Sequence, residues 1–268
     1  MKTSAQSSGR YAPKINQLPN VDKMATTRSC DLQSLIGLEA VLAYQSLLLS
    51  HAQIQGATLF RYDAPPSMQD RIEITHAEST LIERANSMRK GTGIPFWEAI
   101  FATCAVEGHC TEPILAATFF HNGQGSPQYV SRREIEDGIL AKIATGTTRT
   151  VALGSRVVDA LGTSGHVSFL DFHCDVSAGN RAVVHEVCRK VMPRGFLIFD
   201  SGGSYHACTT TVISDGERVR MLAMALLASP IVDARYVAHQ LLQDSSSIRI
   251  SHGGKSGKVP TVIDAWAP

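Results

Sequence analysis

With 268 residues, 44% of them hydrophobic, the chain is large enough to bury a core in one large domain or two small ones. Its formal net charge of +1 excludes a general basic surface for nucleic acid, so any such binding must depend on local patches. The longest apolar run, at residues 221–228, is well under half of the roughly 20 residues that span a bilayer. We therefore expect no membrane segment and a cytoplasmic location.

Two further features limit the class of protein. The six cysteines are scattered and form no CxxC pair, which predicts reduced thiols and disfavours a structural zinc site. Residues 1–28 are polar and lack the hydrophobic stretch of a signal peptide, so we expect a disordered tail there.

The N-terminal half, residues 29–160, reads as a mixture of helices and strands. Apolar residues at helical spacing predict three helices, at 32–52, 94–105 and 132–144. Short apolar runs predict three strands, at 58–62, 114–120 and 148–153. No linker separates this half from residues 161–268, so we expect one continuous unit in which the two halves form a cleft.

The C-terminal half, residues 161–268, has a more regular order. The predicted elements are a strand at 167–173, a helix at 181–191, strands at 195–199 and 204–213, helices at 216–228 and 236–242, and a strand at 247–251. This order is that of the split βαβ or RRM-like pattern, in which the first and third strands are central, antiparallel neighbours. We therefore expect an α+β fold, with an RRM-like half packed against an N-terminal α/β half.

Two pairs of polar residues mark the first and third strands of this half. Asp171 and His173 are two apart at the end of one strand, and Ser204 and His206 are two apart at the start of the other. Residues two apart on a strand share a face, so the pairs are expected to face each other across one ladder. An acid flanked by apolar residues needs a partner when buried, which favours a functional Asp171. His206 could instead be a satisfied core histidine.

Four further polar residues are candidates for the same site. Asp233 could bind a metal or could cap the helix that follows it. Arg235 and His239 are four apart on one helical face, which suits either a solvated edge or contacts to phosphates. Arg249 lies on the last predicted strand and belongs to a local basic patch.

The order of these motifs resembles the catalytic core of the archaeo-eukaryotic primase superfamily. The similar features are a hydrophobic-Asp-hydrophobic motif around Asp171, a Ser-x-His motif on the strand after a hairpin, and a late Asp. Residues 231–241 and 247–251 also resemble the late segments of a bacterial primase-like group in that superfamily, and residues 95–101 and 153–158 resemble its N-terminal half. The resemblance extends over most of the chain from about Ser29.

The resemblance implies an enzyme that joins nucleotides with two divalent metals, Mg²⁺ or Mn²⁺, acting on nucleotide triphosphates and a DNA or RNA template. It gives no indication of protein partners. The metal ligands would be Asp171, His173 and Asp233, which are also the catalytic residues. The nucleotide-binding residues would be Ser204 and His206, for the triphosphate, and Arg235, His239 and Arg249, for phosphate contacts.

One position departs from the superfamily pattern. His173 stands where the superfamily carries a second carboxylate. Mg²⁺ prefers oxygen ligands, whereas an imidazole suits Mn²⁺ or Zn²⁺. Asp175 is a possible substitute for the missing acid, but it lies four residues after Asp171, where a strand has usually ended. A changed metal, a single-metal site and lost polymerase chemistry all fit this replacement. Two functions therefore stay open: a primase-polymerase nucleotidyltransferase, or a degenerate relative that binds nucleotide or nucleic acid without polymerising.

Overall fold

The computed structural model describes residues 30–62, 75–119, 127–146, 149–162, 164–252 and 257–268. The tail predicted at 1–28 lies outside them. The fold is α+β with two antiparallel sheets, which confirms the predicted class. None of the helices in these residues has both the length and the apolarity that crossing a membrane requires.

The first sheet has the strand order β2-β1-β3-β4, and β8 also pairs with β3. Its strands are β1 (Ile54–Tyr62), β2 (Gln128–Ser131), β3 (Thr150–Asp159), β4 (Ser164–His166) and β8 (Ser247–Arg249). The helices beside it are α1 (Ala40–Ser50), α6 (Arg132–Glu136) and α7 (Ile139–Thr145), whereas the short helix η2 (Leu32–Leu35) contacts the last strand of the second sheet. The single helix predicted at 132–144 is wrong, because Gly138 adopts a φ of +74° and separates α6 from α7.

The second sheet has the order β5-β7-β6-β9. Its strands are β5 (Phe169–Asp171), β6 (Phe196–Asp200), β7 (Tyr205–Thr209) and β9 (Thr261–Trp266). The antiparallel pairing of β5 with β7 confirms that the first and third predicted strands are neighbours. The strand predicted at 247–251 does not join them. It is β8, which pairs with β3 in the first sheet, so β5 lies at the edge of its sheet and not at its centre.

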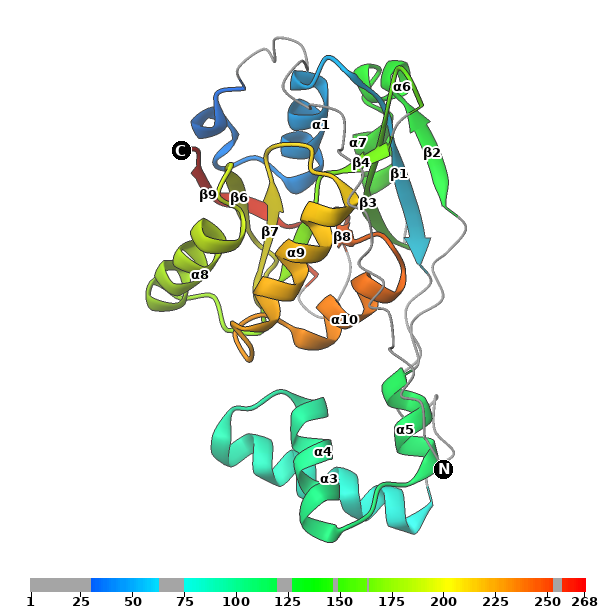
Figure 1. Ribbon diagram of the computed structural model, residues 1–268, viewed down its shortest axis with the longest axis vertical. Helices are drawn as coiled ribbons and strands as arrows, with labels where there is room; N and C mark the ends of the chain where they lie inside the picture. Colours follow the sequence, from blue (N-terminus) through cyan, green and yellow to red (C-terminus); the bar gives the residue numbers. More distant parts are fainter. Residues whose placement is uncertain (1–29, 63–74, 120–126, 147–148, 163, 253–256) are drawn as a thin grey trace, which may run out of the picture.

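Alternate residues of the second sheet contact two different apolar clusters, as the two faces of a strand require. One face, with Phe169 and Cys208, packs with α1 and the first sheet in a shared core. The opposite face is covered by α8 (Ala178–Val191), α9 (Asp215–Leu226) and α10 (Ala234–Leu242) (Figure 1). The shared core therefore holds the two sheets together.

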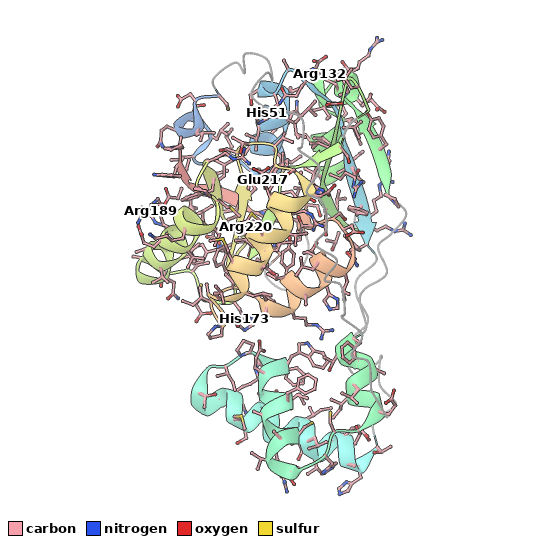
Figure 2. All side chains as sticks on the ribbon, viewed as in Figure 1. His51, Arg132, His173, Arg189, Glu217 and Arg220 are labelled. Atoms are coloured by element: carbon pink, nitrogen blue, oxygen red, sulfur yellow. The ribbon has the colours of Figure 1, made fainter. Side chains whose placement is uncertain are left out.

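The end of α1 is fixed between the sheets by side chains that bind backbone carbonyls. Arg132 donates hydrogen bonds to the carbonyl oxygens of Leu49, His51 and Ile54, each at 3.0 Å (Figure 2). The His51 ring donates to the carbonyl oxygen of Thr210 at 2.9 Å. The last carbonyls of a helix have no partner within the helix, so the bond from Arg132 to the Leu49 carbonyl satisfies one of these groups at the end of α1.

A small helical lobe lies apart from the two sheets (Figure 1). It is formed by α3 (His76–Thr92), α4 (Phe96–Glu107) and α5 (Glu112–Phe119), which share their own apolar cluster. The helix predicted at 94–105 is confirmed as α4, with Pro95 at its N-cap. The strand predicted at 114–120 is wrong. A short apolar run does not distinguish strand from helix, and here a proline in the first turn suits the helix α5.

A buried polar network ties the first sheet to α9. The Ser155 hydroxyl donates to His166 Nδ1 at 2.9 Å, and His166 Nε2 donates to Asp215 Oδ1 at 2.7 Å. The backbone N–H of Ser246 donates to the Ser155 hydroxyl oxygen at 2.8 Å. Ser155 and His166 are both 0% exposed, so no substrate reaches this Ser-His-Asp arrangement. It connects β3, β4, the first turn of α9 and the residue before β8.

We predict that this network makes the protein acid-sensitive. Burial lowers the pKa of His166 below its usual value of 6.5. The unfolded chain therefore binds a proton below about pH 6.5 that the folded protein resists, and the free energy of unfolding should fall as the pH decreases from there. His166→Ala should lower that free energy by about 2–4 kcal/mol at pH 7.5 and reduce its dependence on pH.

Urea unfolding at pH 7.5, 6.5 and 5.5 measures both effects. His76→Ala is the matched control, since His76 is exposed at the start of α3. A His166 variant as stable as the control would contradict a structural role for the network.

Candidate active site

The two most informative residues of the sequence lie opposite each other in the second sheet. Asp171 on β5 is the direct partner of His206 on β7. His206 Nε2 lies 3.3 Å from Asp171 Oδ1, and the two side chains are 12% and 31% exposed. Both lie on the same sheet face as Phe169 and Cys208, the face turned toward the first sheet. The predicted arrangement of these two residues on neighbouring strands is confirmed.

Backbone pairing brings Asp233 to the same place. The segment before α10 runs along the free edge of β5, with a β-bridge between Phe172 and Val232. The backbone N–H of Asp233 donates to the carbonyl oxygen of Asp171 at 3.0 Å. Asp233 Oδ1 also accepts from the backbone N–H of Tyr236 at 2.8 Å, so Asp233 is the N-cap of α10. The prediction that Asp233 caps the following helix is confirmed, and this capping residue lies beside Asp171.

The charges at this site are strongly perturbed. Burial, and then the neighbouring Asp233, raises the pKa of Asp171 to about 8. Burial, and then the positive charge of Arg249, lowers the pKa of His206 to about 3. At neutral pH both side chains are therefore uncharged, and their contact is not an ion pair. Asp171 Oδ1 and His206 Nδ1 are buried without a hydrogen-bond partner.

Arg249 supplies a fixed positive charge next to this pair. Its guanidinium donates to the carbonyl oxygens of Ser201 and Ser251, each at 2.9 Å, and to that of Lys258 at 2.5 Å. Three carbonyl partners from separate segments hold the group in place. Burial lowers the pKa of Arg249, while the nearby Asp171 opposes that change.

Ser204 lies two residues before His206, in the turn that leads into β7. Its hydroxyl is 3.2 Å from that of Ser201, which in turn donates to the Ser204 carbonyl oxygen at 3.0 Å. Ser204 lies outside β7, which begins at Tyr205, so strand alternation does not place its hydroxyl, and its contact with a triphosphate stays a prediction.

The three remaining sequence candidates are Arg235, His239 and His173. The Arg235 guanidinium lies 4.3 Å from the centre of the Trp97 ring and donates to the carbonyl oxygen of Ala117, so it contacts the helical lobe. His239 follows one turn later on α10. His173 is exposed and lies at the lower edge of the two-sheet body, toward the helical lobe (Figure 2). Phosphate contacts by Arg235 and His239, and metal binding by His173, stay predictions.

Two tyrosines near the site were not identified from the sequence. The Tyr236 hydroxyl donates to the carbonyl oxygen of Ser247 at 3.0 Å, and the Tyr62 hydroxyl is 3.1 Å from the Ser247 hydroxyl. Burial, and then the nearby Asp171, raises the pKa of Tyr236. The sequence could have placed Tyr236 near the site, because it follows Asp233 by three residues and an N-cap side chain accepts a hydrogen bond from the backbone N–H at that position. Tyr62 depends on contacts between distant segments, which no local pattern shows.

The described residues contain no group of three or more His, Cys, Asp or Glu side chains arranged to hold a metal ion. The coupled acids Asp171 and Asp233, with a buried carboxyl oxygen that has no partner, form a smaller set. Mg²⁺ is commonly bound by one or two carboxylates together with substrate phosphates and water. Asp171 and Asp233 are therefore chemically suited to supply the protein carboxylates of such a cation.

Comparison with known proteins adds one finding. Residues 135–261 match the family model of the archaeo-eukaryotic primase 1D-like domain. This segment is just under half of the chain, and it contains Asp171, His206, Asp233 and Arg249. The resemblance seen in the sequence is thereby confirmed for this segment, whereas the similar residues at 95–101 lie outside it. No curated protein and no solved structure matches the chain.

We predict that the buried acid destabilises the metal-free protein. The pKa of Asp171 is about 8 in the folded protein instead of 3.8, so the unfolded chain releases this proton above about pH 4 whereas the folded protein retains it up to about pH 8. The free energy of unfolding should therefore fall as the pH rises from about 4 to about 8. Asn titrates in neither state, so the stability gained by Asp171→Asn relative to wild type should increase with pH and be about 1–2 kcal/mol larger at pH 8 than at pH 5.

Urea unfolding in the presence of a chelator measures the difference at each pH. Asp175→Asn serves as the control, because Asp175 is an exposed acid four residues further along. An equal stability difference at pH 5 and pH 8 would rule out a raised pKa at Asp171.

Proposed function

We propose that this protein is a metal-dependent nucleotidyltransferase of primase-polymerase type. The observation that carries the proposal is the buried Oδ1 of Asp171, which accepts no hydrogen bond and lies near the second acid Asp233, within a segment that matches the primase-like family. A buried carboxyl group with a strongly raised pKa beside a second acid is typical of a functional site. A divalent cation bound there would offset the repulsion between the two acids.

The arrangement of the second sheet supports the same proposal. The unit β5-α8-β6-β7, with β5 next to β7, corresponds to the first part of the RRM-like pattern that the resemblance implies. In our proposal the cleft lies on the face of this sheet that carries Asp171 and His206, opposite the first sheet. The α8 and α9 helices on the other face would then act as structural support.

Each residue has a specific task in the proposed reaction. Asp171 and Asp233 hold the cation, which when bound supplies charge neutralisation and alignment for in-line attack by a 3′-hydroxyl on a nucleotide triphosphate. His206 and Ser204 donate hydrogen bonds to the phosphates of that triphosphate. The fixed guanidinium of Arg249 adds positive charge near the charge that develops on the phosphates. A DNA or RNA strand serves as the template.

We predict that purified protein extends a primer or starts a new strand with Mg²⁺ or Mn²⁺. Asp171→Asn and Asp233→Asn should each lower the rate by at least about 100-fold, since metal contacts contribute several kcal/mol of transition-state stabilisation. Asn is also a good N-cap, so Asp233→Asn removes the acid while keeping the cap of α10.

The control for this assay is Asp175→Asn, which removes a nearby acid that the proposal does not use. Extension should be measured on primed and unprimed templates with Mg²⁺, Mn²⁺ and Zn²⁺. Equal activity in Asp171→Asn and the control would exclude this active site.

A second function is favoured by two observations. Fewer than three metal-binding side chains gather around Asp171 in the described residues, and His173 replaces the second carboxylate of the superfamily. A degenerate relative that binds nucleotide or nucleic acid without polymerising would tolerate both features. The two functions differ in whether the site still binds a catalytic cation.

We predict that His173→Asp raises Mg²⁺ affinity if the site is a modified metal centre, because it restores an oxygen ligand at the position where the superfamily has one. Isothermal titration calorimetry of wild type, His173→Asp and the neutral control His173→Asn measures this. Unchanged affinity in both variants, together with a silent Asp171→Ala, would favour the degenerate binding protein.

A further inference from the structure

A second hollow in the structure lies away from Asp171. It has a volume of about 290 Å³ and lies between the end of α8, the turn that follows, the end of β7 and one side of α9. The residues that line it include Lys190, Met192, Arg194, Thr211, Glu217, Arg220, Met221 and Met224.

This pocket is separate from the candidate active site. Thr209, which lines it, lies three residues beyond His206 on β7, or about 10 Å along a strand. Its other walls come from α8 and α9, which cover the sheet face opposite to Asp171 and His206. In Figure 2, Glu217 and Arg220 lie along α9, whereas His173 lies at the lower edge of the same body. A ligand in the pocket would therefore not touch the site.

The charge of the lining is positive. Three cations, Lys190, Arg194 and Arg220, face a single acid, Glu217. The Arg194 guanidinium forms a salt bridge with Glu217 at 2.5 Å, so these two charges neutralise each other. Among the described residues, neither Lys190 nor Arg220 has a salt-bridge partner. The lining thus keeps about two positive charges, which match the charge of −1.5 to −2 on a phosphate monoester at pH 7.

The rest of the lining suits an apolar group. Three of the seven methionines of the chain, Met192, Met221 and Met224, line this one pocket. Methionine side chains are polarizable and adapt to flat aromatic surfaces. The Thr211 hydroxyl oxygen, in the same lining, is buried without a hydrogen-bond partner. It can donate to or accept from a polar group on the ligand.

The volume limits the size of the occupant. Small-molecule sites usually measure about 300–1,000 Å³, so this pocket is at the lower end of the range. It has room for one ring system with one phosphate and not for a nucleic acid strand. We propose that this pocket binds a nucleoside monophosphate, or a phosphate monoester of similar size and aromatic character, as a second site. The proposal does not depend on the proposed polymerase activity.

Methyl NMR of protein labelled at methionine tests this directly. Adenosine monophosphate should shift the methyl signals of Met221 and Met224 with a Kd below about 1 mM, while Met88 in the helical lobe serves as an internal reference. Adenosine alone and inorganic phosphate alone should each bind at least 10-fold more weakly. The shifts should persist in the double variant Asp171→Asn and Asp233→Asn, which has an altered active site.

Arg220→Glu should weaken the binding at least 10-fold, whereas Arg181→Glu should leave it unchanged. Both residues are exposed on helices of the same layer, and both substitutions change the charge equally. The proposal fails if the nucleotide shifts no pocket methionine at about 1 mM, if adenosine or phosphate alone binds as tightly, or if the two charge variants weaken binding equally. Loss of the shifts in the active-site double variant would also overturn it.

Discussion

Two acids are held side by side in a largely buried place, and backbone hydrogen bonds keep them there. The N–H of Asp233 donates to the carbonyl oxygen of Asp171, so the separation of the two residues is set by strand pairing and not by their side chains. Burial, and then the repulsion from Asp233, raises the pKa of Asp171, and in our proposal a bound cation would relieve that repulsion. The pairing with His206, the cap of α10 and the fixed Arg249 are all arranged around this unfavourable pair.

The parts of the fold that could be predicted from the sequence are those set by short-range order. The succession strand, helix, strand, turn, strand was enough to place β5 beside β7, because that pattern has few packing solutions. The sheet to which β8 belongs could not be predicted. Ile248 and Ile250 give an apolar pattern that either sheet could bury, and both contribute to the shared core. The choice depends on which strand edge is free, which is a property of the whole fold.

In the candidate site, too, the features set by neighbouring residues could be predicted and those set by distant contacts could not. The spacing of Ser204 and His206, and the apolar neighbours of Asp171, were readable because each is a local pattern. The contact between Arg235 and Trp97 was not, since it joins α10 to a helical lobe from a distant part of the sequence. The sequence left Arg235 with two readings, a solvated edge or a phosphate contact. The structure adds a third, as a residue that positions the helical lobe next to α10.

The last strand has a consequence for how the primase-like segment can be isolated. The family match ends at residue 261, whereas β9 runs from Thr261 to Trp266 and pairs with β6. Its other edge is hydrogen-bonded to residues 37–40, far upstream of the match. A fragment cut at the family limits would expose the edge of β6, whose Leu197 and Phe199 are fully buried in the whole protein. Open apolar edges can pair with other chains, so the segment that matches the family is smaller than the unit that covers the edge of β6.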